Sequence, residues 1–238
     1  NFLIAAARRL AHRLAQLRSG EHRPDADALQ AAFCDVIREC IFGVDINPIA
    51  VELCKHALWI ESRTDPSVVR SIDRHIKIGN ALLGATPELI ESGIPDGSCR
   101  VSAKDRAHSV SELATPTRRV RTDLIDEADP SAGSSHHARL IADTWCASFM
   151  WRESGSASAI DLPHDPTTPS AISDALFQSI RHDPESIASS LKQKIESLAA
   201  QSRFFHWHIE FEEVFPSPTG TGRSGGFDVV IGNPPFLN

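Results

Sequence analysis

Residues 41–48 read Ile-Phe-Gly-Val-Asp-Ile-Asn-Pro, and this stretch decides the fold class. The run 41–46 is apolar at all but two positions, which predicts a short strand buried on both faces, as in a parallel sheet. Asn47 then offers a side chain that caps a helix, and Pro48 occupies the favoured first helical position. We therefore expect a strand, a sharp turn and a helix over residues 48–61.

Three further segments fit the same plan. Residues 75–80, His-Ile-Lys-Ile-Gly-Asn, alternate in polarity and predict a second short strand. Residues 227–232, Phe-Asp-Val-Val-Ile-Gly, are typical of a third, buried strand. Leucine and alanine recur at spacings of three and four over residues 2–18, which predicts an amphipathic helix.

The chain between the second and third predicted strands has a different composition. Residues 85–138 are polar and rich in Ser, Pro, Gly and charge, which indicates an irregular insertion. Apolar residues at helical spacing return over 141–149 and 187–198, whereas 216–226 consist almost entirely of Pro, Gly, Ser and Thr and predict a flexible loop. We divide the chain into a first part of the sheet domain (1–84), a mostly helical insertion (85–203) and a return to the sheet (204–238).

Composition limits the function classes. The 238 residues are 41% hydrophobic and 23% charged, which is ordinary for a globular protein and argues against disorder. The formal net charge of −7 means that any contact with nucleic acid must be local, through the basic residues of 1–23 or 100–121. A solvated helix face and a solvated loop explain these two stretches more simply. Five cysteines without a C-x-x-C pair, no long apolar run and no signal peptide predict a cytoplasmic protein without a membrane segment.

The residues that follow the third predicted strand carry the clearest chemical signal. Asn233-Pro234-Pro235-Phe236 forms a rigid turn just outside the carboxyl edge of the sheet, where open α/β sheets bind ligands. Carbonyl oxygens beside an aromatic ring suit a flat group that carries an amino function. The alternative is a simple turn with Phe236 in the core.

Two other predicted strands end in polar residues at the same edge. Asp45 ends the first strand, where a carboxylate can accept both hydroxyls of a ribose. Asn80 and Leu82 follow the second strand and could border an adenine ring. The alternatives are a helix cap for Asp45 and an ordinary turn for the other two.

Two other patterns have weaker interpretations. Residues 220–225 match G-x-G-x-x-G but precede a strand, so no helix follows to bind a phosphate. Alternating His and Glu over 206–213 could converge on a metal, but an amphipathic strand with a solvated acidic side explains the pattern more simply. We therefore expect no metal site.

Several stretches resemble the amino-group DNA methyltransferases that use S-adenosylmethionine, and within them the adenine-specific modification enzymes of type IIG restriction systems. Residues 41–55 are similar to the second cofactor motif of that family, and residues 78–84 to its third. Residues 226–236, Gly-Phe-Asp-Val-Val-Ile-Gly-Asn-Pro-Pro-Phe, resemble its catalytic motif. Residues 204–215 resemble a segment that precedes the catalytic strand, and residues 1–3 the tail of the first motif.

The resemblance implies transfer of a methyl group from S-adenosylmethionine to N6 of an adenine flipped out of double-stranded DNA, in a restriction-modification or phage-defence system. The Asn233 side chain and the Pro234 carbonyl would accept the two amino N–H groups, and Phe236 would stack on the base. No cysteine follows a proline, which argues against methylation of a cytosine ring carbon. The implied residues are Phe2, Asp45, Ile46, Asn80 and Leu82 for the cofactor, and Asn233, Pro234, Pro235 and Phe236 for catalysis.

The resemblance also implies a fold. We expect an α/β domain with an incomplete, doubly wound Rossmann-like methyltransferase sheet and a long, largely helical insertion. The glycine-rich first motif would precede residue 1 and a target-recognition domain would follow residue 238, so the remainder of the chain is itself an expected partner.

Three alternatives stay open. A protein glutamine N5-methyltransferase would hold a side-chain amide in the same Asn-Pro-Pro-aromatic turn. A nicotinamide-dependent dehydrogenase would use Asp45 for a ribose but leaves Asn233 to Phe236 without a task. A non-catalytic nucleotide-binding fragment is the third.

Overall fold

The computed structural model describes residues 2–63, 65–95, 132–151, 169, 171–215 and 225–233. These residues form helices and a small parallel sheet, and the chain divides into two compact units. Unit 1 comprises residues 1–82 and 211–238, and unit 2 comprises residues 83–210. No helix in the described ranges combines the length and hydropathy that a bilayer crossing requires.

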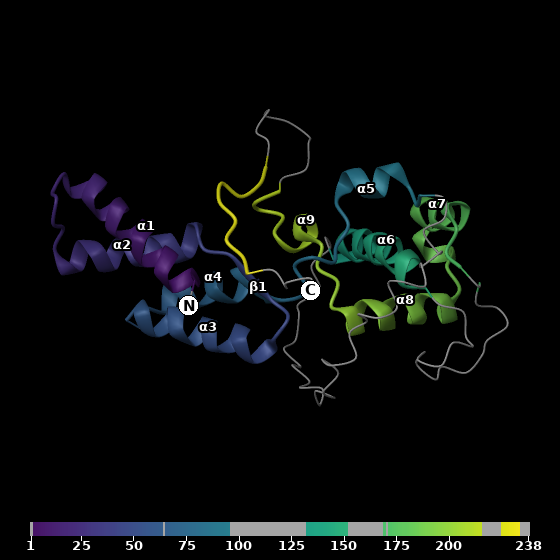
Figure 1. The fold of residues 1–238 in the computed structure, drawn as a ribbon, viewed down its shortest axis with the longest axis horizontal. Helices are drawn as coiled ribbons and strands as arrows, with labels where there is room; N and C mark the ends of the chain where they lie inside the picture. The colour runs from purple at the N-terminus through teal and green to yellow at the C-terminus, as the bar shows by residue number, and fades with distance from the viewer. Residues whose placement is uncertain are drawn as a thin grey trace. The chain divides into compact units, whose positions relative to one another are not determined.

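Unit 1 begins with two helices that pack along one another (Figure 1). α1 (Phe2–Ser19) confirms the helix predicted over residues 2–18. Its partner is α2 (Ala26–Glu39). Small side chains at a spacing of four let the two backbones approach closely, and the alanines at this contact are buried: Ala7, Ala11 and Ala15.

The sheet of unit 1 consists of β1 (Gly43–Asp45) and β2 (Ile76–Ile78), which pair in parallel with Asp45 opposite Ile78. The predicted strands 41–46 and 75–80 are therefore confirmed in place and direction. The prediction that the first is buried on both faces is wrong, because Val44 is only half-buried and Asp45 is exposed. Burial of both faces needs an element packed on each, and the described residues do not provide it.

Two helices connect β1 to β2. α3 (Pro48–Glu61) confirms the helix predicted over residues 48–61, and the Asn47 side chain caps it by accepting the Ile49 N–H at 2.9 Å. α4 (Pro66–His75) runs directly into β2. The core beneath these helices contains Val51, Leu58, Val68 and Ile72.

The strand predicted over residues 227–232 is wrong. Residues 225–233 form no strand, and Val229, Val230 and Ile231 are 74%, 77% and 60% exposed. Extended apolar chain becomes a strand only when a neighbour supplies the ladder of hydrogen bonds, and within the described ranges no strand pairs with this segment. The Rossmann-like arrangement thus stays a prediction beyond the two strands seen.

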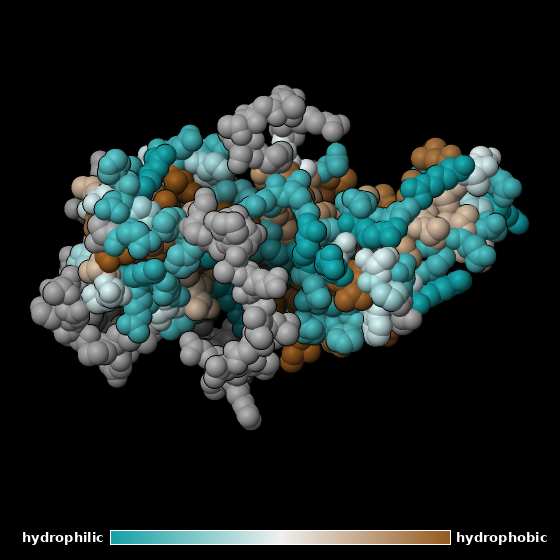
Figure 2. Space-filling model, turned by 180° about the vertical axis from the view of Figure 1, so that it is seen from behind, coloured by the Kyte–Doolittle hydropathy of each residue, from teal (hydrophilic) through white to brown (hydrophobic). Residues whose placement is uncertain are grey.

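Large apolar side chains reach the surface elsewhere in unit 1 as well. On the face drawn in Figure 2, hydrophobic residues appear as separate brown patches among hydrophilic ones. α3 has such a stripe along its outer face, where residues one turn apart remain exposed. Its apolar members are Ile49, Leu53 and Ile60.

The elements of unit 2 in the described ranges are helical. Much of the insertion predicted over 85–203, including most of the irregular stretch 85–138, lies outside the described residues, as does most of the loop predicted over 216–226, so these stay predictions. α6 and α8 pack side by side around a core that includes Phe177 and Ile195 (Figure 1). The three-part division of the chain remains a prediction. The helical elements are α5 (Pro87–Ser92), α6 (Ala132–Met150), α7 (Asp174–His182), the 3₁₀ turn η2 (Pro184–Ser186), α8 (Ser189–Ser202) and α9 (Trp207–Glu210).

A buried histidine joins distant segments of unit 2. The His206 side chain is fully buried; its Nδ1 accepts the Ala85 N–H at 3.0 Å, and its Nε2 lies 2.9 Å from an oxygen of Asp143. Because Nδ1 accepts, the ring proton belongs on Nε2, where it is donated to the carboxylate. The amphipathic strand predicted around residues 206–211 is wrong: His206 is an interior anchor, and the short helix α9 begins at the next residue.

Candidate functional site

The polar edge predicted from the sequence exists at the carboxyl ends of β1 and β2. The Gly79 N–H donates to the Asp45 carbonyl at 3.0 Å, which extends the parallel register just past the last residue pair. Asn80 therefore emerges beside Asp45 at one edge of the sheet. The structure places these two predicted residues at the same edge of the sheet, as expected for neighbouring parallel strands, and their roles in a site stay predictions.

Local hydrogen bonds shape both turns at this edge. The Asp45 carboxylate is exposed, and one of its oxygens accepts the Asn47 N–H at 2.8 Å. Asn47 itself caps α3, so Asp45 is not the helix cap of the alternative interpretation. The Asn80 side-chain oxygen accepts the Leu82 N–H at 3.1 Å, which makes a tight turn after β2.

Apolar side chains flank this polar pair. Ile46 is 42% exposed and Leu82 is 67% exposed, so both predicted residues present apolar surface to solvent. An exposed carboxylate and a half-buried amide close to exposed apolar side chains suit a ligand that has a polar rim and a flat apolar body.

Phe2 lies in the first turn of α1 and is exposed. The start of this helix contacts β1, because a Cβ added at Gly43 would meet Leu3 Cδ1 at 2.5 Å. No hydrogen bond or ring contact joins Phe2 to Asp45 or Asn80 in the described part of the chain. Its assignment to the cofactor site stays a prediction.

The predicted catalytic residues are placed only in part. Asn233 is exposed at the end of the segment 225–233, and Pro234, Pro235 and Phe236 lie outside the described residues. Near the start of the segment, the ring of Phe227 lies 5.3 Å from the ring of Phe42, the residue just before β1. The structure thus attaches the start of this segment beside the sheet.

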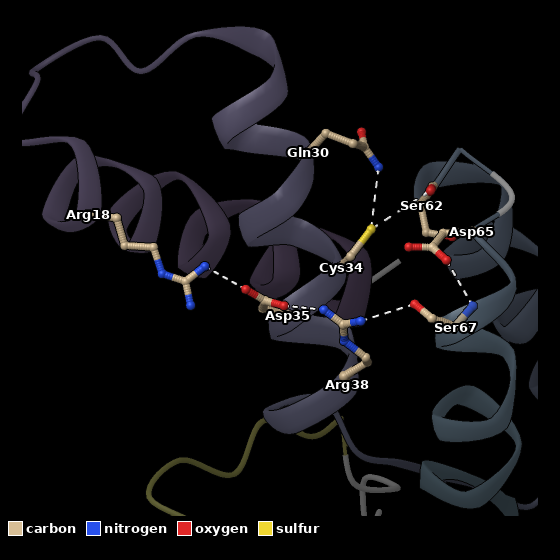
Figure 3. Close-up of polar contacts among 8 residues, drawn as sticks. All are labelled: Arg18, Gln30, Cys34, Asp35, Arg38, Ser62, Asp65 and Ser67. Atoms are coloured by element: carbon tan, nitrogen blue, oxygen red, sulfur yellow. Dashed lines mark hydrogen bonds and ion pairs between the residues drawn. The ribbon is translucent and has the colours of Figure 1, made fainter.

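A separate open cavity of about 440 Å³ lies between α2 and the turn that joins α3 to α4. Figure 3 shows its polar network: Arg18 and Arg38 both bind Asp35, and Arg38 also donates to the Ser67 hydroxyl at 3.0 Å. The hydrogen bond from Arg18 holds the pKa of Asp35 below its usual value. These charged groups form ion pairs and hydrogen bonds with one another. We therefore interpret them as a structural ion-pair network and not as a ligand site.

Cys34 at this cavity is a poor candidate nucleophile. Its sulfur lies 3.7 Å from Gln30 Nε2 and 3.9 Å from the Ser62 carbonyl oxygen. Burial raises the pKa of the Cys34 thiol, and the thiolate is the reactive form. Within the described residues, no three His, Cys, Asp or Glu side chains converge as metal ligands.

The comparison with protein families gives a match over most of the chain. A family model described as Eco57I restriction-modification methylase matches residues 39–238, a range that covers β1, β2 and the segment 225–233. Comparisons with curated proteins and with solved structures gave no match.

Proposed function

The chain belongs to the Eco57I restriction-modification methylase family, and from that membership we propose that it methylates N6 of adenine in duplex DNA with S-adenosylmethionine as donor. Membership in the family implies a methyltransferase of a restriction-modification system. Our proposal adds that the methylated base is adenine, that the methylated atom is N6 and that the methyl donor is S-adenosylmethionine. The observation that carries it is the pair Asp45 and Asn80 at one edge of parallel strands.

The residues at this edge fit the proposed donor. Asp45 has an exposed carboxylate oriented by the Asn47 N–H, and it would accept the ribose hydroxyls. Ile46 and Leu82, both exposed, would cover the faces of the adenine, and Asn80 would lie at its rim. When bound, the donor supplies an electrophilic methyl group on a sulfonium.

The Asn233 turn would supply the rest of the chemistry. The lone pair of an adenine amino nitrogen is delocalised into the ring, which makes the nitrogen a weak nucleophile. Acceptance of its two N–H groups by the Asn233 side chain and the Pro234 carbonyl would favour a pyramidal, more nucleophilic nitrogen. Stacking of Phe236 on the flipped base would fix the line of attack, so positioning and hydrogen bonding would carry most of the catalysis.

The charge of α1 supports duplex DNA as the substrate. This helix contains four arginines and no acidic residue. Arg8 binds Glu61 and Arg18 binds Asp35, whereas Arg9 and Arg13 are exposed one turn apart and have no ion-pair partner among the described residues. Two adjacent unpaired guanidinium groups suit contacts to backbone phosphates.

Calorimetric titration with S-adenosylmethionine tests the cofactor part. Asp45→Ala should weaken binding about tenfold or more, because it removes charge-assisted hydrogen bonds to the ribose. Asp27→Ala is the matched control, since the Asp27 side chain is 97% exposed and lies on α2, away from the sheet edge. Equal affinity for both variants would remove Asp45 from the site.

Transfer of label from methyl-tritiated donor tests the substrate. We expect N6-methyladenine in nucleosides digested from duplex DNA, and a loss of about 10²–10³-fold in turnover for Asn233→Ala at unchanged donor affinity. Label in protein glutamine would favour the alternative substrate, and absence of label from both would contradict the proposal.

A further inference from the structure

A carboxylate outside the polar edge ties the segment before Asn233 to the sheet of unit 1. Glu213 binds Arg74 and also lies 3.0 Å from His75 Nε2. Arg74 and His75 are the last two residues of α4, immediately before β2. One acidic side chain therefore contacts the end of a helix at the point where a strand begins.

His75 makes this contact from a buried position. Its side chain is only 4% exposed, and its ring stacks on Phe42 at 4.0 Å between centroids, with an interplanar angle of 25°. A carboxylate only accepts hydrogen bonds, so Nε2 carries the hydrogen and donates it to Glu213. Burial lowers the pKa of His75 and outweighs the opposite effects of Glu213 and the Ile37 carbonyl, while Arg74 acts in the same direction as burial.

The turn that carries Glu213 also holds the start of the segment 225–233. The Gly226 N–H donates to the Val214 carbonyl at 2.9 Å. The ring of Phe227 lies 6.0 Å from Phe211 and 5.6 Å from Phe215. Phe42 joins the same cluster, at 5.2 Å from Phe211 and 5.3 Å from Phe227. We call Phe42, Phe211, Phe215 and Phe227 the Phe cluster.

Beyond Phe227, the described part of the segment, residues 228–233, is no longer attached in this way. Residues 229–231 are strongly exposed, and residues 228–233 make no hydrogen bond to other described residues. The position of Asn233 therefore depends on how firmly the Phe cluster and Glu213 hold the chain about six residues earlier.

We propose that Glu213, held by Arg74 and His75, is a positioning residue for the Asn233 turn. It fixes the 211–215 turn on the end of α4, and the Phe cluster transmits this fixed position to the segment that leads to Asn233. The role of Glu213 in methyl transfer rests on the proposed function, whereas the anchoring of residues 225–233 does not.

Hydrogen exchange of the whole chain tests the anchoring. Glu213→Gln keeps the size of the side chain but removes the charge that binds Arg74 and His75. We expect amide exchange at Val214, Phe215 and Gly226, whose N–H groups are hydrogen-bonded at this turn, to rise about three- to tenfold, because the ion pair is partly exposed and of moderate strength. Glu212→Gln is the matched control, since Glu212 is an exposed neighbour with no ion-pair partner among the described residues. Equal exchange in the two variants would overturn the proposal.

A second pair of variants, both on α4, tests the role of Arg74 as the partner of Glu213. Arg74→Gln should raise exchange in the same residues as Glu213→Gln does, and Arg70→Gln, an exposed position on the same helix, should not. If Arg70→Gln has the effect of Arg74→Gln, a general loss of positive charge is the cause and Glu213 is not an anchor.

Kinetics separate positioning from simple stabilisation. With adenine methylation as the readout, Glu213→Gln should lower kcat several-fold and leave the donor affinity and the thermal midpoint unchanged. A fall in the thermal midpoint that accounts for the lost activity would overturn the positioning role. If exchange changes as expected but the wild type methylates no DNA, the proposed function fails while the anchoring stands.

Discussion

The two units differ in what they leave on their surfaces. In the described part of unit 1, large apolar side chains are exposed on α1, on α3, at the sheet edge and over residues 229–231. In the described part of unit 2, Leu89 is the large apolar residue that reaches solvent, while Phe177 and Ile195 are fully buried. The described residues of unit 2 therefore bury nearly all of their large apolar side chains, whereas those of unit 1 leave many exposed.

Their buried polar groups differ in a similar way. In unit 2, the buried His206 ring has a hydrogen-bond partner on each nitrogen, the Ala85 N–H on Nδ1 and the buried Asp143 carboxylate on Nε2. In unit 1, the buried His75 ring lies 3.0 Å from the carboxylate of Glu213, which is partly exposed and belongs to a turn far away in the sequence. Among the described residues, unit 1 therefore has the larger exposed apolar surface, which is the kind of surface that can bind a ligand or a partner.

The largest expected effect tests this contrast in apolar burial. Phe177→Ala should lower the free energy of unfolding by about 3–5 kcal/mol, because it leaves a cavity in the core of unit 2. Phe2→Ala removes the same side chain where it is exposed in unit 1 and should change stability by less than about 0.5 kcal/mol. Urea unfolding followed by circular dichroism measures both. A large loss for Phe2→Ala would show that its apolar surface is covered.

A smaller effect is expected from two glycines. A Cβ added at Gly84 would lie 2.0 Å from the Phe205 carbonyl oxygen, a backbone atom that cannot move without its neighbours. Gly84→Ala should therefore destabilise unit 2 by about 1–3 kcal/mol. At Gly232 nothing lies within 4 Å in the described structure, so Gly232→Ala in unit 1 should be neutral. The thermal unfolding midpoints of the two variants measure this difference. Equal midpoints would show that Gly84 is not more tightly packed than Gly232.

The smallest effect concerns pH. Burial lowers the pKa of His75 in unit 1 and of His208 in unit 2, so the unfolded chain binds more protons below its own histidine pKa of about 6.5. The free energy of unfolding should thus fall as pH decreases below about 6.5, and become level once the folded histidines also titrate. Urea titrations between pH 5 and 8 measure this slope. His75→Gln should reduce it, and an unchanged slope would assign the effect to unit 2.

Residues 41–48 were predictable because their signals are local. Apolar residues before Asn47 and Pro48 define a strand end and a helix start within eight positions, and the structure has both. The position of Asn80 at the same sheet edge as Asp45 was also predictable, because parallel strands end at the same edge. The polar half of the candidate site was therefore predictable.

Residues 227–232 show the opposite case. Their apolar pattern is as typical of a strand as that of residues 41–46, yet they form none in the structure. The pattern at 206–211 also predicted a strand, but the His206 ring bonds to Ala85 and Asp143, which lie far away in the sequence. Such partners leave no local signal, and the contact of Glu213 with His75 was missed for the same reason.

The sequence by itself determined that residues 2–18 and 48–61 form helices, that two short strands form a parallel pair and which polar residues follow them, because caps, prolines and periodicity act over a few residues. Only the tertiary structure decided whether an apolar segment becomes a strand and which carboxylate meets which histidine. Those outcomes depend on partners brought together by folding, and a strand or an ion pair does not form without its partner.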